Sequence, residues 1–193
     1  MDESKRIIRA RFLAERNALS GEDRSEKSAE ICRRILACEE FRRARVVMLY
    51  RSVRSEVSLE GLTDAEPGGE KIFLWPRCGR DGVMDAVLPE GEWTRGAFGI
   101  PEPAAGVIVD PRDIDLVICP CAAFDETGVR LGMGGGYYDR FLPRCVRAFS
   151  AAAAFEAQKA DALPTDEWDV RMDRIFTELT AYPRENRANL VFD

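Results

Sequence analysis

The chain has 193 residues, a length suited to one domain, and 46% of them are hydrophobic, which is enough to form a core. Its formal net charge is −6 with both signs interleaved, so no broad basic surface for nucleic acid or an anionic membrane is indicated. The absence of histidine excludes Ser-His-Asp and Cys-His nucleophile systems and histidine-ligated zinc. Any chemistry must therefore use carboxylates, Lys, Arg, Tyr, backbone amides or a metal bound by oxygen.

The sequence shows no pattern typical of a signal peptide, a membrane span or a cysteine motif. The charged start of the chain lacks the apolar core of a signal peptide, and no stretch approaches the roughly 20 apolar residues that a membrane span needs. We therefore expect a cytoplasmic protein without a membrane or nucleic-acid partner, and no obligate protein partner is evident. Six cysteines lie scattered without a CxxC pair, so we expect reduced and mostly buried thiols rather than a zinc or redox site.

The first predicted elements are helical. Residues 3–18 carry apolar side chains at helical spacing, with charged side chains on the other side. Ser20 with Asp23 three residues later has the pattern of a capping box, which would open a second amphipathic helix through about Leu36. We therefore predict that the chain begins with a helical hairpin.

From residue 45 the pattern changes to short apolar runs bounded by glycine, proline or charge. Runs of this kind are typical of strands buried on both faces, as in a parallel sheet. The predicted strands are residues 46–50, 71–75 and 114–119, with weaker ones at 83–88, 147–155 and 174–179.

Helices and loops are expected between these strands. The helices fall around residues 57–65 and 137–147, and Pro143 should kink or shorten the second one. Two segments rich in proline and glycine, residues 96–103 and 120–136, are expected to be loops.

The order of elements predicts the fold class. Alternating strands and helices favour an α/β sheet that is covered by helices on both faces. No internal repeat or linker divides the chain, so we predict a single domain over residues 1–193.

A glycine-rich segment follows the clearest strand. Residues 128–139 hold five of the chain's fifteen glycines and precede a predicted helix. Such a position, after the carboxyl end of a strand and before a helix N-terminus, suits a phosphate bound by backbone amides. The Walker pattern is absent because there is no Gly-Lys dipeptide, and Tyr137 replaces the last glycine of GxGxxG. Taken alone, the segment fits an anion-binding loop or a structural turn equally well.

The residues of this region are also recognisable. Phe124-Asp125 and then residues 128–140 (GVRLGMGGGYYDR) resemble the signature of the 5-formyltetrahydrofolate cyclo-ligases, also called methenyltetrahydrofolate synthetases. Other family elements have similar counterparts in the same order, over nearly the whole chain. They are the KxxxR element at residues 5–9, Tyr50 followed by Glu56-Val57, the GIxEP turn at 99–103, and an acidic block at 164–170 with Asp173.

The resemblance implies a three-layer αβα sandwich with a mostly parallel central sheet, and an enzyme that uses ATP and magnesium to close 5-formyltetrahydrofolate into 5,10-methenyltetrahydrofolate. It implies that ATP is bound by Lys5, Arg6, Ile7, Ile8, Arg9, Arg130, Leu131, Gly132, Met133, Gly134, Gly135, Gly136, Tyr137 and Tyr138. It further implies that the folate is bound by Glu56, Met133, Gly134, Gly135, Gly136 and Tyr137, magnesium by Asp139 and Asp169, and that Lys5, Arg9 and Arg130 are catalytic.

The implied chemistry agrees with the composition, because phosphoryl transfer depends on positioning and charge neutralisation and needs no histidine. Each residue alone also has an ordinary interpretation. Lys5 and Arg9 are four residues apart and could simply form a solvated helix face, and Glu56 could be a surface carboxylate. Asp139 could cap a helix or pair with a neighbouring arginine, and Asp169 could be a loop acid.

Three residues depart from the family pattern, and two other functions remain as alternatives. Gly135 stands where some relatives carry a basic residue, Met133 is apolar, and Trp168 stands where other members have histidine. A relative that binds folate or nucleotide without turnover is the main alternative, and the joint presence of the cations and both metal-ligand aspartates argues against it. A nucleic-acid adaptor is disfavoured by the net charge.

Overall fold

The computed structural model describes residues 3–66, 68–79, 82–96 and 98–183. Its centre is an eight-stranded sheet in the order β12-β11-β10-β7-β1-β2-β3-β6. The five strands from β11 to β2 run parallel, while β12, β3 and β6 are antiparallel to their neighbours. The mostly parallel sheet is therefore confirmed. The strand bounds are β1 Val46–Met48, β2 Ile72–Cys78, β3 Met84–Pro89, β6 Gly106–Val109, β7 Leu116–Cys119, β10 Phe149–Ala153, β11 Arg174–Phe176 and β12 Ala181–Pro183.

The central strands are the most apolar ones, as expected for a parallel sheet covered on both faces. All four residues of β7 are buried, as are Ser150 to Ala153 of β10. Successive side chains of a strand point to opposite faces. Val47 accordingly belongs to one core cluster and Met48 to the other, so two cores sandwich the sheet.

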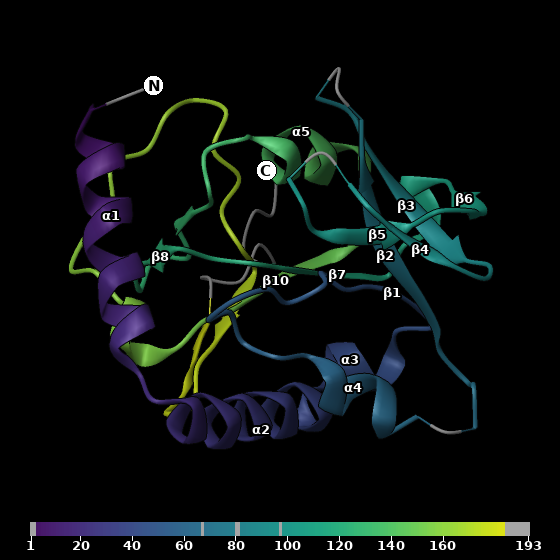
Figure 1. Cartoon of the computed structure of the whole chain (residues 1–193), viewed down its shortest axis with the longest axis horizontal. Helices are drawn as coiled ribbons and strands as arrows, with labels where there is room; N and C mark the ends of the chain where they lie inside the picture. Colours follow the sequence, from purple (N-terminus) through teal and green to yellow (C-terminus); the bar gives the residue numbers. More distant parts are fainter. Residues whose placement is uncertain (1–2, 67, 80–81, 97, 184–193) are drawn as a thin grey trace, which may run out of the picture.

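Helices cover both faces. One core packs under α2 (Gly21–Ala37), α3 (Glu39–Arg43) and α4 (Glu60–Asp64), and the other under α5 (Tyr137–Phe141) with the 3-10 turn that follows it. Figure 1 shows α2, α3 and α4 below the sheet and α5 above it. The three-layer αβα sandwich is confirmed.

Helix α1 (Glu3–Ala18) stands beside the sheet rather than in a helical layer (Figure 1). Phe12 packs in a separate cluster with the short hairpin of β8 (Ala123–Phe124) and β9 (Arg130–Leu131). The two N-terminal helices follow one another as predicted, but their buried residues lie in different clusters. Helix α2 therefore covers a face of the sheet, whereas α1 lies beside the sheet and next to the glycine segment.

Several local predictions need correction. Residues 96–103 were expected to form a loop, but Pro101–Pro103 is β5, which pairs with β4 (Trp93–Arg95). Residues 120–136 were also expected to be a loop, yet they contain the β8–β9 hairpin. These strands are only two or three residues long, and their pairing with a partner segment, rather than an apolar run, defines them. The helix expected at 137–147 does end early, since Pro143 lies in the 3-10 turn Leu142–Arg144.

All six cysteines are free, and four of them are buried, which confirms the expectation for the thiols. Burial raises the pKa of the Cys119 thiol to about 12, so it remains protonated at physiological pH. Among the described helices, none combines the length and apolar character that crossing a membrane requires.

The predicted capping box is present. The Ser20 hydroxyl accepts the Asp23 N–H at 3.0 Å, and Asp23 accepts the Ser20 N–H at 3.4 Å. We expect Ser20→Ala to lower the free energy of unfolding by about 1 kcal/mol. In a thermal melt this corresponds to a fall in Tm of roughly 2–4 °C. Ser25→Ala, an exposed change inside the same helix, is the matched control. Equal Tm values for the two variants would contradict a stabilising cap.

Candidate active site

The glycine segment wraps closely around arginine side chains. Arg9 on α1 donates Nε–H to the Gly132 carbonyl at 2.7 Å. Gly134 and Gly136 have φ values of +97° and +64°, which L side chains rarely adopt. A Cβ on Gly134 would lie 3.5 Å from the Arg9 guanidinium carbon, and a Cβ on Gly132 would lie 3.1 Å from Nη1 of Arg130. Glycine at these positions lets the backbone approach the guanidinium groups of Arg9 and Arg130 closely. This close approach explains why the segment is rich in glycine.

Arg130 is a buried cation beneath this segment. Its side chain is 2% exposed, and Nη2 donates to Asp139 Oδ1 at 2.7 Å. The guanidinium also lies over the Tyr138 ring, 5.7 Å from its centroid. Within the described residues, Arg130 Nε and the Tyr138 hydroxyl are buried without a hydrogen-bond partner. Orphaned buried polar atoms are rare and point to a ligand or water that completes them.

Lys5 joins α1 to the acidic block. Nζ donates to Asp166 Oδ2 at 2.8 Å and to Asp169 Oδ2. Burial lowers the pKa of Lys5, but the hydrogen bonds and charges of the two aspartates outweigh it and leave the pKa raised. Lys5 therefore carries its positive charge one helical turn from Arg9, which contacts the glycine segment.

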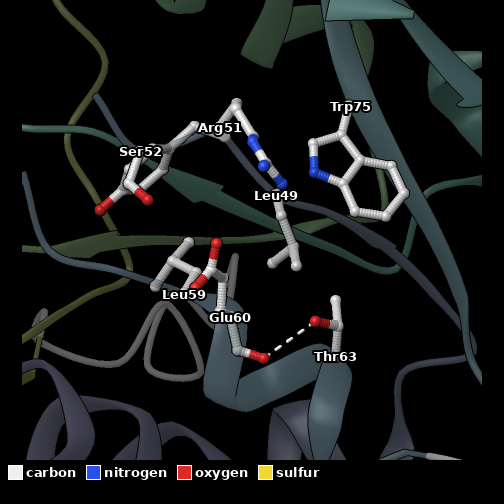
Figure 2. Close-up of a pocket in the computed structure, with 8 residues that line it drawn as sticks. Leu49, Arg51, Ser52, Leu59, Glu60, Thr63 and Trp75 are labelled. Carbon is white, nitrogen blue, oxygen red and sulfur yellow. Dashed lines mark hydrogen bonds between the residues drawn. The ribbon is translucent and has the colours of Figure 1, made fainter. Parts of the chain in front are cut away.

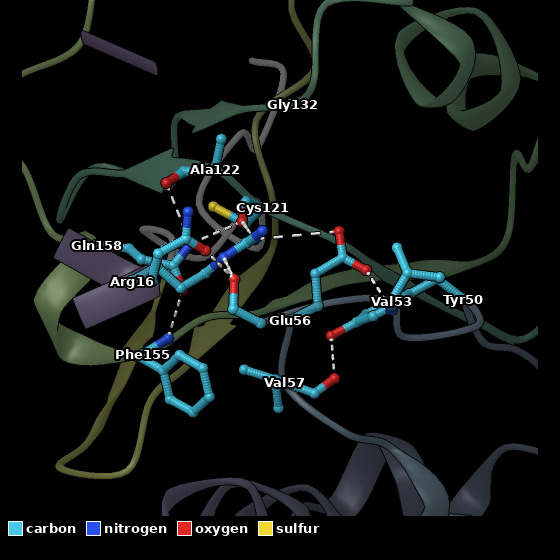
Figure 3. A network of polar contacts seen from close by, with 12 residues as sticks. Arg16, Tyr50, Val53, Glu56, Val57, Cys121, Ala122, Gly132, Phe155 and Gln158 are labelled. Atoms are coloured by element: carbon cyan, nitrogen blue, oxygen red, sulfur yellow. Dashed lines mark hydrogen bonds and ion pairs between the residues drawn. The ribbon is translucent and has the colours of Figure 1, made fainter. Parts of the chain in front are cut away.

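Glu56 lies in the loop after β1, at the same edge of the sheet (Figure 3). Its side chain is 10% exposed, and Oε2 accepts the Val53 N–H at 3.0 Å. Burial raises the pKa of Glu56, while the Val53 N–H and the charges of Arg16 and Arg54 oppose the rise. Burial also raises the pKa of Tyr138, with smaller contributions from neighbouring groups that include Glu56.

The remaining predicted residues fall into two groups. Tyr137 donates its hydroxyl to the Gly79 carbonyl at 3.0 Å and meets the Phe98 ring edge-on, and Met133, four residues earlier in the glycine segment, is exposed. These side chains can form an open apolar wall for a ring. In contrast, Arg6 pairs with Glu3 at the surface.

The two other predicted residues of α1 are apolar and take different positions. Ile7 is exposed, and Ile8 packs on the cluster of α1 and the β8–β9 hairpin. The helix thus directs Arg9 to the glycine segment and Lys5 to the acidic block, while Ile8 packs against the hairpin and Ile7 stays exposed.

Comparisons with known proteins show the family to which the chain belongs. A model of the 5-formyltetrahydrofolate cyclo-ligase family matches residues 1–178. The chain belongs to this family. The mouse 5-formyltetrahydrofolate cyclo-ligase is 28% identical over 198 residues, which cover 92% of this chain and 95% of that protein. The Escherichia coli K12 cyclo-ligase is 28% identical over 170 residues, covering 84% and 93% of the two chains.

Solved structures of methenyltetrahydrofolate synthetases share the fold. The NMR structure of the Aquifex aeolicus 5,10-methenyltetrahydrofolate synthetase is 33% identical with a TM-score of 0.82, and the match covers 94% of this chain and 93% of that one. The Mycoplasma pneumoniae synthetase is 25% identical with a TM-score of 0.77, and the match covers 92% and 99%. The cyclo-ligase resemblance seen in the sequence is confirmed.

The sequence interpretation placed Asp125 in the family signature without giving it a role, and it missed Arg16. Asp125 is buried and accepts the Leu163 N–H at 3.0 Å, which anchors the start of the acidic block. Arg16 is buried and contacts the loop that carries Glu56. A signal existed for Arg16, because its spacing from Lys5 and Arg9 places it on the same helix face.

The donor set can be tested against the magnesium that the cyclo-ligase resemblance implies. Within the described ranges, no three His, Cys, Asp or Glu side chains gather around one point. Asp139 and Asp169 are instead each paired with a cation, Arg130 and Lys5 respectively. Magnesium commonly binds one or two carboxylates plus substrate phosphates and waters. Each of these two aspartates offers the oxygen donors that magnesium prefers, and in this structure each is paired with a cation.

A cavity on the α4 side of the sheet is distinct from this cluster (Figure 2). Arg51 and Trp75 face each other across it, above Leu59 and Glu60. None of the residues predicted to bind ATP, folate or metal lines this cavity. The candidate site of the cyclo-ligase fold is therefore the arginine-lined glycine segment with its flanking carboxylates.

Proposed function

We propose that this chain cyclises 5-formyltetrahydrofolate to 5,10-methenyltetrahydrofolate at the expense of ATP, releasing ADP and phosphate. One observation carries the proposal beyond family membership: Arg9, from the first helix, and Arg130 both lie against the backbone of the glycine segment. Two guanidinium groups gathered in this way can bind and neutralise phosphates.

The reaction needs this arrangement for a chemical reason. A formyl amide is a poor electrophile and its oxygen is a poor leaving group. Transfer of the γ-phosphoryl group of ATP to that oxygen corrects both, after which the neighbouring aniline nitrogen attacks the carbon and phosphate departs with the oxygen. Phosphoryl transfer is accelerated chiefly by positioning and by charge stabilisation, which guanidinium and amide groups supply.

The residues then take separate roles. Lys5, Arg9 and Arg130 hold the phosphates, and the exposed Met133 and the half-buried Tyr137 contact both the nucleotide and the folate. Glu56 accepts a hydrogen bond from the pterin. Asp139 and Asp169 would hold magnesium together with the phosphates, and the ion would neutralise their charge.

A coupled assay tests the proposed function. Purified protein with ATP, magnesium and 5-formyltetrahydrofolate should form ADP and the ultraviolet absorbance of the methenyl product in equal amounts. ADP formation should require the folate, and chelation of magnesium should stop it. Folate binding by calorimetry without ADP formation would instead identify a non-catalytic binding protein. If the protein neither formed the products nor bound folate, the proposal would be contradicted altogether.

A further inference from the structure

Arg16, near the end of α1, is a buried cation that the proposed chemistry does not use. Its side chain is 4% exposed. Nε donates to the Ser55 hydroxyl at 3.0 Å, and Nη1 donates to the Cys121 carbonyl at 3.3 Å. Figure 3 shows the guanidinium reaching from the helix toward Glu56. Arg16 therefore joins α1, the loop after β1 and the end of β7, the three elements that carry the site.

The two oxygens of Glu56 are in different positions. Oε2 accepts the Val53 N–H at 3.0 Å, which fixes the carboxylate in its loop. Oε1 faces Arg16 Nη1 at 4.0 Å, which is too long for a hydrogen bond. The Arg16 charge thus acts on Glu56 through space and leaves lone pairs of Oε1 for another donor.

The pKa of Glu56 depends on burial, on the Val53 N–H and on nearby charges. Burial raises the pKa of Glu56, and Arg16 from α1 and Arg54 in the same loop act against this. The other titratable groups that interact with it are Tyr50 and Tyr138. Burial raises the pKa of both tyrosines well above the usual range, so both are neutral at physiological pH. Arg16 is therefore the buried charge that favours the ionised form of Glu56.

We propose that Arg16 is a positioning residue for folate binding, which holds Glu56 as an oriented carboxylate whose Oε1 accepts an N–H group of the pterin. The inference rests on the proposed function, which assigns Glu56 to the folate. An ionised carboxylate only accepts hydrogen bonds, whereas a protonated one presents an O–H toward the same N–H groups. Loss of the Arg16 charge should therefore weaken folate binding as the pH falls.

The variant Arg16→Gln tests this inference. We expect its KM for 5-formyltetrahydrofolate to rise about tenfold, with the KM for ATP unchanged. The acid limb of kcat/KM for the folate should move about one pH unit upward, because Glu56 then protonates at higher pH. Arg16→Lys keeps the positive charge, although it cannot reproduce both hydrogen bonds, and should return the acid limb toward its wild-type position.

Gln158→Met is the matched control for a merely structural role. Gln158 Nε2 donates to the same Cys121 carbonyl at 2.7 Å and to the Ala122 carbonyl at 3.1 Å, without contacting Glu56. Its replacement should lower Tm and leave the folate KM and the acid limb unchanged. If Arg16→Gln changes only Tm, as this control does, Arg16 has only a structural role and the inference is wrong.

Two further comparisons keep the outcomes separate. Glu56→Gln should raise the folate KM and abolish the acid limb. If Glu56→Gln has these effects but Arg16→Gln leaves the folate KM and the acid limb unchanged, only the role of Arg16 is disproved. Calorimetric binding of 5-formyltetrahydrofolate to the same variants needs no turnover, so a wild-type protein without activity contradicts the proposed function and not this inference. Should Arg16→Gln fail to fold, Arg16→Lys decides, since an upward shift of its acid limb despite the retained charge would overturn the inference.

Discussion

Replacing Asp139 by asparagine is expected to lower kcat of the cyclisation by about 10³-fold, because the carboxylate serves both the proposed ion and the Arg130 pair. Asparagine is the informative substitution. Arg130 is buried, and complete removal of its carboxylate partner would leave an unpaired charge, which typically costs about 3–5 kcal/mol of stability. The asparagine oxygen still accepts from Arg130, so Asp139→Asn should retain the fold while losing the charge.

Two measurements separate catalysis from folding in this variant. The magnesium concentration for half-maximal rate should rise strongly, while Tm should fall by only a few degrees. Asp110→Asn is the matched control, because Asp110 also pairs with an arginine, Arg112, but at an exposed site. That control should leave kcat unchanged. A folded Asp139→Asn enzyme with a rate within tenfold of wild type would remove Asp139 from the proposed metal site.

The sheet was predictable because its central strands are continuous apolar runs. β7 and β10 are buried on both faces, and this leaves a pattern that does not depend on knowing their neighbours. β5 was not predictable in the same way, since Pro101 and Pro103 are typical of loops and only pairing with β4 makes the segment a strand. The position of α1 was equally hidden, because an amphipathic pattern shows that a face is buried without showing what buries it.

The site shows the same division. The glycine segment was visible because glycines at positive φ are required there, and the family resemblance named its partners. The contacts of those partners come only from the fold. Lys5 pairs with carboxylates far along the chain, and Arg16, whose spacing shows only that it shares a helix face with Lys5 and Arg9, is buried beside Glu56. Long-range pairing of charges leaves no local pattern in a sequence.

The second large effect is expected at Lys5, whose charge lies between Asp166 and Asp169. Lys5→Met retains much of the apolar stem but removes the ammonium group, so two carboxylates are left without their cation and the phosphates without theirs. We expect the KM for ATP to rise about 100-fold, equivalent to about 2.7 kcal/mol, with a smaller change in the KM for the folate. Arg11→Met, on the same helix but with an exposed side chain paired to Glu15, is the matched control and should change neither constant. A KM for ATP within threefold of wild type in folded Lys5→Met would mean that Lys5 only ties α1 to the acidic block, and that Arg9 and Arg130 alone bind the phosphates.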